Sequence, residues 1–243
     1  IWRMGGLQLV MGEREGARFQ DAYSGRWFYN CHCNGGVFNL GHRNPRVLAA
    51  VQAAMGHADI GNHHLVSPYR AAAAERLAAT TGGALPGVVF SVGGGEAVDL
   101  ALKLARAHTG RDTIVSVDGA YHGHTGLALA AGAGSERALF HNELPGFTKV
   151  PYNDLDAMVA AVDERTAAVI LEAIPATAGF PMPEPGYLAG VRAACDAAGA
   201  LLVIDEVQTG LGRTGTTWYC QQESVTPDAL ITGKGLSGGV YPI

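Results

Sequence analysis

Residues 200–208 (ALLVIDEVQ) decide the fold class. The first five are apolar, and such a short continuous run is typical of a strand that is buried on both faces of a sheet. Two carboxylates and an amide follow this run closely. In open α/β sheets, ligands bind outside the carboxyl ends of the strands. The stretch therefore predicts a buried strand over 200–207, with a ligand site where it ends.

Helices and strands alternate around this stretch. Apolar periodicity and apolar runs predict helices at 45–55, 68–80, 154–164 and 187–198 and one from residue 96, and strands at 88–92, 113–117, 168–172 and 228–232. This alternation predicts an α/β fold whose mostly parallel sheet is covered by helices on both faces. We expect residues 1–44 to belong partly to a small N-terminal lobe and residues 45–243 to form one large domain.

The composition excludes several classes of protein. Hydrophobic residues make up 48% of the 243 residues, which is enough for a large core. A net charge of -5 provides no basic patch for nucleic acid, and no apolar run approaches the ~20 residues of a membrane span. The four cysteines lack the C-x₂-C pairs of a zinc site, so we expect free thiols, a reducing compartment and no metal. The chain begins at Ile1 and stops at Ile243, and we interpret it as a fragment.

Three glycines, Gly93, Gly94 and Gly95, stand between the predicted strand at 88–92 and the helix from residue 96. Glycine lets a backbone come close to an anion, and a helix N-terminus supplies N–H groups and a positive dipole. The alternative is a glycine-rich turn without a ligand. The dinucleotide-binding fingerprint is excluded, because its third glycine would fall at Val98.

Two further strand ends carry polar side chains. Tyr121 and His122 follow the strand at 113–117, and a tyrosine there can stack on a flat heterocycle, although a surface pair is the commoner arrangement. Asp205 ends the most apolar strand, and a buried carboxylate needs a partner. A protonated pyridine nitrogen, a Mg²⁺ ion and a structural salt bridge are the alternatives. A Mg²⁺ ion bound together with a nucleotide is excluded, because it requires a Walker A motif. The sequence has Asp228 at the position where that motif needs glycine.

Lys234 stands among glycines directly after the predicted strand at 228–232. A desolvated lysine loses pKa and becomes a Schiff-base nucleophile, and a flexible surface loop is the alternative. The stretch also matches G-x-S-x-G around Ser237, as in a serine hydrolase, but that function leaves Lys234, Asp205 and Tyr121 unexplained. An anion cradle, a stacking aromatic, a carboxylate for a ring nitrogen and an amine nucleophile together are what pyridoxal phosphate (PLP) requires.

The order and spacing of these motifs resemble the class III aminotransferases of PLP fold type I, the ornithine and 4-aminobutyrate type. The likeness runs through essentially the whole chain and is strongest over residues 202–215 (LVIDEVQTGLGRTG). The chain departs from the family at 93–95, where Ser-Gly-Thr/Ala is usual, and at Ala173, where proline is usual. The resemblance also implies that the large domain is incomplete at its C-terminus.

The resemblance assigns roles to particular residues. Lys234 carries the cofactor as a Schiff base and moves the proton at the substrate Cα. Asp205 pairs with the pyridine nitrogen. Glu172 lies on the side of the cofactor where the substrate binds, and it interacts with the carboxylate or the amine of the substrate. The other implied cofactor contacts are Gly94 and Gly95 at the phosphate, Tyr121 and Val207 on the two ring faces, Gln208 at the phenolic oxygen and His122 behind Asp205.

The function that the resemblance implies is PLP-dependent transfer of an amino group. The donor is an amino acid or amine, and the acceptor is an oxo acid or aldehyde. Racemases, aminomutases and decarboxylases of the same family use the same lysine and aspartate, and they remain alternatives. A cytoplasmic homodimer with no nucleic-acid or membrane partner is also expected.

Overall fold

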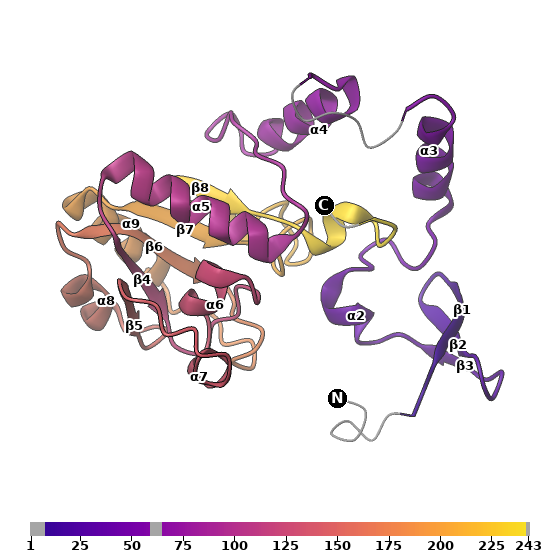
Figure 1. Ribbon diagram of the computed structural model, residues 1–243, viewed down its shortest axis with the longest axis horizontal. Coiled ribbons are helices and arrows are strands. Elements are labelled where there is room, and N and C mark those ends of the chain that lie inside the picture. The colour runs from indigo at the N-terminus through magenta and orange to yellow at the C-terminus, as the bar shows by residue number, and fades with distance from the viewer. Residues whose placement is uncertain (1–7, 59–64, 242–243) are drawn as a thin grey trace. The chain divides into compact units, whose positions relative to one another are not determined.

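The computed structural model describes residues 8–58 and 65–241 (Figure 1). These residues fold into two compact units. Of the described residues, the smaller unit comprises 8–58, 65, 66 and 234–241, and the larger unit spans residues 67–233. The first break therefore follows Val66. The domain boundary at residue 45 stays a prediction.

A five-stranded sheet forms the centre of the larger unit, in the order β5-β4-β6-β7-β8. Every pair of neighbouring strands is parallel, which confirms the predicted α/β fold class. All seven residues of β6 are buried, as expected of a strand with neighbours on both sides and helices on both faces. The strands are β4 (Thr113–Val117), β5 (Phe147–Val150), β6 (Thr166–Glu172), β7 (Leu201–Asp205) and β8 (Ala229–Ile231).

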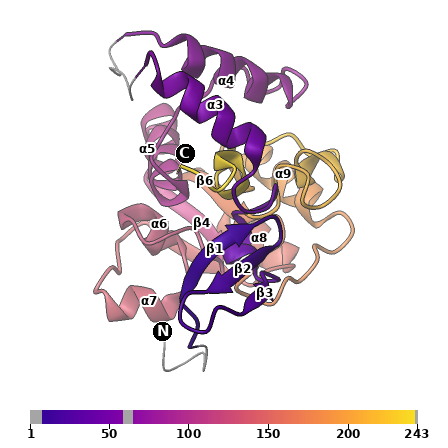
Figure 2. The same cartoon turned by 90° about the vertical axis from the view of Figure 1, so that its right-hand side faces the viewer.

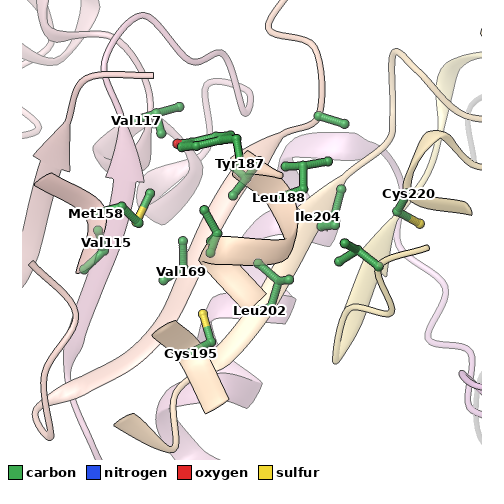
Figure 3. Close-up of a cluster of buried hydrophobic side chains, with 14 of the residues drawn as sticks. Val115, Val117, Met158, Val169, Tyr187, Leu188, Cys195, Leu202, Ile204 and Cys220 are labelled. Atoms are coloured by element: carbon green, nitrogen blue, oxygen red, sulfur yellow. The ribbon is translucent and has the colours of Figure 1, made fainter. Parts of the chain in front are cut away.

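Helices cover both faces of this sheet (Figure 1). Successive side chains of a strand point to opposite faces, so Ile170 packs with α5 and α6 while Val169 packs with α8 and α9. Figure 3 shows the second of these clusters, with Val169 beside the side chains of α9. The covering helices are α5 (Gly94–Thr109), α6 (Gly126–Ala131), α8 (Leu155–Ala161) and α9 (Tyr187–Ala198).

The smaller unit contains a three-stranded antiparallel sheet in the order β1-β2-β3 (Figure 2). Strands this short leave little periodic signal in a sequence, and the sheet was not predicted. The elements of this unit are β1 (Met11–Glu15), β2 (Arg18–Asp21), β3 (Trp27–Tyr29), the short turn α2 (Cys33–Gly36), α3 (Pro45–Met55) and the 3₁₀ turn η2 (Lys234–Ser237).

The strand predicted at 88–92 is wrong. These residues form no ladder, and Val89 and Val92 are 66% and 77% exposed. An apolar run becomes a strand only where another strand satisfies its N–H and C=O groups, and none of the described strands pairs with it. The remaining elements of the larger unit are α4 (Pro68–Ala79), α7 (Gly134–Leu139) and the 3₁₀ turn η1 (Tyr219–Gln221). Within the described ranges, no helix is long and apolar enough to cross a membrane.

Candidate cofactor site

The carboxyl ends of the parallel strands gather the predicted residues of the larger unit. Glu172 at the end of β6 is in register with Asp205 at the end of β7, and Asp205 is in register with Ile231 of β8. Tyr121 and His122 follow β4, which borders β6 on its other side. Residues far apart in the sequence therefore meet at one edge of the sheet, as expected of an open α/β fold.

The carboxylate of Asp205 is buried and held on both of its oxygens. Oδ2 lies 2.8 Å from Nδ1 of His122, a side chain that is itself fully buried. Oδ1 accepts a hydrogen bond of 3.1 Å from the N–H of Val207. An ionised carboxylate can only accept, so a hydrogen bond to it at this contact requires the His122 tautomer with a proton on Nδ1. The two contacts fix the orientation of the Asp205 carboxylate.

The first turn of α5 lies against two other loops. A Cβ added to Gly94 would come within 3.3 Å of Val207. Gly123, with φ +114°, passes so close that its added Cβ would be 2.7 Å from Cα of Gly95. The N-cap of α5 is Gly93, which has no side chain to satisfy the first N–H groups of the helix. This glycine cradle is suited to an anion such as a phosphate.

Glu172 is a buried carboxyl group at this edge. It is 4% exposed, and its Oε1 accepts a 2.8 Å hydrogen bond from the N–H of Tyr121. Burial, and secondly the negative charge of Asp205, raise the pKa of Glu172 to about 7. A carboxyl group with this pKa can bind or release a proton near neutral pH, as acid and base groups in active sites do.

Tyr121 keeps an accessible ring beside these groups. Its side chain is 41% exposed, and its hydroxyl lies 3.2 Å from Nδ1 of His124. Burial raises the pKa of the Tyr121 phenol, with smaller contributions from the charges of Glu136 and Glu172. Tyr121 therefore presents a neutral, partly exposed aromatic ring that can stack on a heterocycle.

Two further residues predicted for the site, Gln208 and Lys234, take no part in the contacts described so far. Gln208 follows Val207 in a turn of the larger unit and is half-buried. Lys234 belongs to the smaller unit, where it opens η2 with a φ of 40°. That conformation is uncommon for a residue other than glycine, and strained backbone of this kind clusters at functional sites. The chain joins Lys234 to Ile231 of β8 through only two residues.

Ser237, the candidate hydrolase nucleophile, takes part in a local turn of the smaller unit. Its Oγ donates to the carbonyl of Lys234 at 2.9 Å and accepts from the N–H of Gly239 at 3.0 Å. A nucleophilic serine needs a base within hydrogen-bonding reach. The observed bonds are those of a turn and lend the hydrolase alternative no support.

Two residues beside the site were missed from the sequence. Oγ1 of Thr125 lies 3.2 Å from the point that a Cβ of Gly95 would occupy, and nothing in the local sequence marks this contact. Glu206 is 1% exposed and accepts hydrogen bonds from a distant loop. Its position after an apolar strand was a usable signal, because a second buried carboxylate also needs partners.

The fold is that of the PLP transferases of fold type I. The structure is similar to ornithine aminotransferase from Toxoplasma gondii ME49, with a TM-score of 0.89 and 29% identity over 99% of this chain and 60% of that one. It is also similar to taurine:2-oxoglutarate aminotransferase from Bifidobacterium kashiwanohense, which was solved in complex with PLP and glutamate. That comparison has a TM-score of 0.90 and 28% identity, over 98% of this chain and 59% of the other.

The chain belongs to the class III aminotransferase family, whose members use PLP. The family's sequence model, Aminotransferase class-III, matches residues 4–243. An uncharacterized aminotransferase of Archaeoglobus fulgidus is 52% identical over 243 residues, which are all of this chain and 57% of that protein. The chain thus spans somewhat more than half the length of the relatives that it matches.

Proposed function

We propose that the full-length protein is a PLP-dependent aminotransferase, with an amino acid or amine as donor and an oxo acid or aldehyde as acceptor. One observation carries the proposal: the buried Asp205 carboxylate, fixed by His122 and the N–H of Val207, at the sheet edge that also bears the glycine cradle. Amino transfer is favoured over racemisation, aminomutation and decarboxylation, because the relatives described above are named as aminotransferases.

The residues of this chain suit PLP in type and in order. A phosphate needs N–H donors, a pyridine nitrogen needs a carboxylate, and the aldehyde needs an amine. When bound, PLP supplies an electron sink for the bonds at the substrate Cα. The residues that would hold it are Gly94 and Gly95 at the phosphate, Tyr121 and Val207 on the ring faces, Asp205 at the ring nitrogen, Gln208 at the phenolic oxygen and Lys234 at the aldehyde carbon.

Three side chains of the protein would each perform one part of the reaction. Asp205, oriented by His122, holds the ring nitrogen in its protonated form. Nζ of Lys234 takes the proton from the substrate Cα and returns it, which is general acid–base catalysis by an amine. Glu172, whose pKa of about 7 lets it exist in both forms, faces the amine or carboxylate of the substrate.

We also infer a cytoplasmic homodimer, as the resemblance to the family implies. Several large apolar side chains are exposed to solvent in the described chain, among them Val89, Val92, Phe180 and Met182, and a partner subunit would bury such side chains. Sedimentation of the full-length protein measures the assembly. A fully active monomer would contradict the inferred dimer and leave the proposed chemistry untouched.

The proposed reaction is tested by a half-reaction. An amino donor added to the full-length holoenzyme should change the absorption spectrum of the cofactor, and an oxo acid added next should restore it. A protein that binds PLP but never completes this cycle with any donor would contradict amino transfer and point to one of the other PLP reactions.

A further inference from the structure

Glu206 is a buried carboxylate directly after Asp205, with 1% of its surface exposed. Its Oε2 accepts hydrogen bonds of 2.8 Å from the hydroxyl of Thr209 and from the N–H of Tyr219. Its Oε1 accepts a third, also of 2.8 Å, from the N–H of Cys220. A buried carboxylate is costly unless it is hydrogen-bonded, so these three donors are what make the arrangement stable.

The backbone of Glu206 closes a turn around two residues of the proposed site. Its N–H donates to the carbonyl of Ile231 at 2.9 Å, and its carbonyl accepts from the N–H of Gly210 at 2.9 Å. Val207 and Gln208 therefore lie between two fixed ends. Within the turn, the hydroxyl of Thr209 donates a third hydrogen bond, to the carboxylate of Glu206.

The far side of the Glu206 carboxylate is anchored as well. Trp218, which is 2% exposed, donates from Nε1 to the hydroxyl of Thr80 at 2.9 Å. Gln221 donates from Nε2 to the carbonyl of Thr80 at 2.8 Å, so the segment around η1 is tied to the end of α4. Trp218 also packs so tightly on Gly210 that an added Cβ there would be 2.6 Å from Cζ3 of the indole. Glu206 thus links the turn that carries Val207 and Gln208 to the segment around η1, which is itself hydrogen-bonded to the end of α4.

We propose that Glu206 is a positioning residue, which sets Val207 and Gln208 in place for the cofactor. The inference rests on the proposed function, because only a bound PLP gives those two residues a ligand. Val207 is the sensitive member, since its side chain lies against Gly94 and its N–H binds Asp205. A shift of this turn would move the ring contact, the glycine cradle and the Asp205 carboxylate together.

The test is Glu206→Gln in the full-length protein. Glutamine keeps the shape of the side chain but replaces one accepting oxygen by an NH₂ group, so the N–H of either Tyr219 or Cys220 loses its acceptor. We expect the Kd for PLP to rise on the order of tenfold. We also expect the visible circular dichroism band of the bound cofactor to change, because that band reports how the ring is held. A residue that contributed to stability alone would lower the melting temperature and leave the band unchanged.

Glu223→Gln is the matched control. Glu223 accepts a 3.1 Å hydrogen bond from the hydroxyl of Tyr219, a residue of the same segment and not of the turn at 206–210. This variant should keep the Kd and the spectrum of the wild type.

Thr209→Val provides a second, milder variant. It removes a single donor to Glu206, and the Kd should rise in the same direction by a smaller factor. A wild-type Kd and dichroism band in Glu206→Gln would overturn the proposal, and so would the same result in Thr209→Val if the first variant fails to fold. A wild-type protein that binds no PLP would instead refute the proposed function.

Discussion

Nδ1 of His122 and Oδ2 of Asp205 lie 2.8 Å apart, although 83 residues separate them in the sequence. The strand order explains the contact, because β4 and β7 both border β6 and point the same way. The loop after β4 therefore meets the end of β7. Both side chains are buried, so this hydrogen bond is shielded from water and worth more than a surface contact.

His122→Phe should lower the catalytic rate while PLP still binds. Loss of the hydrogen bond leaves Asp205 less well oriented, and we expect kcat to fall about tenfold to a hundredfold. His122→Asn is the matched control, because its amide can donate to Asp205 from nearly the same position as Nδ1. Asn should recover much of the loss in a single-turnover assay. Equal rates in the Phe variant and the wild type would contradict a role for this contact.

Asp205→Asn should separate cofactor binding from turnover. The amide keeps the size of the side chain, but it cannot hold a ring nitrogen in the protonated state, so the electron sink weakens. Turnover should fall by several powers of ten while much of the PLP affinity remains. Titration with PLP and stopped-flow half-reactions measure the two quantities. Near-normal half-reaction rates would show that Asp205 is only structural.

Glu172→Gln should change how stability depends on pH. The pKa of Glu172 is about 7 in the folded protein against 4.5 as the ordinary value, so folding favours the protonated form. That contribution is present in full below pH 4.5 and is lost as the pH rises through 7. Glutamine is neutral throughout, so the variant should match the wild type at low pH and exceed it above pH 7.

The size of the Glu172 effect follows from the same shift. The difference between the folded pKa of about 7 and the ordinary pKa of 4.5 corresponds to a free energy on the order of 3 kcal/mol. Above pH 7 the free energy of unfolding of the variant should exceed that of the wild type by this amount. Urea unfolding of the cofactor-free protein between pH 5 and 8 measures it. A difference between variant and wild type that stays constant with pH would mean that Glu172 titrates normally.

Gly123→Ala should displace the start of α5. Gly123 has a φ of +114°, and an added Cβ there would lie 2.7 Å from Cα of Gly95. We expect PLP affinity to fall about tenfold, because the glycine cradle must shift. Gly126→Ala is the matched control, because an added Cβ there meets nothing within 4 Å, and it should keep the wild-type affinity. An unchanged affinity in Gly123→Ala would rule out this steric explanation.

Local patterns in the sequence predicted local structure well. The helix expected at 187–198 is α9 with the same bounds, and it ends at Gly199 in the left-handed conformation that glycine allows. The strand at 113–117 is β4, also with the expected bounds. The strand expected at 88–92 failed because pairing, which the run itself does not encode, decides whether an apolar segment becomes a strand.

The candidate site was predictable as a set of residue types at strand ends, but most of its contacts were not. The family resemblance placed His122 behind Asp205, whereas the residues near His122 do not themselves indicate this partner, since strand order decides that contact. Glu206 likewise binds N–H groups of residues 219 and 220, beyond a loop whose path is set by tertiary packing.

A covalent bond between Lys234 and PLP underlies the proposed reaction, and borohydride reduction detects that bond. Borohydride converts the imine to a stable secondary amine, so digestion and mass spectrometry of the reduced full-length protein locate the attached group. We predict one pyridoxyl group on Lys234, and none on Lys103 or Lys149, which serve as internal controls. A pyridoxyl group on another lysine, or none at all, would show that Lys234 does not carry the cofactor.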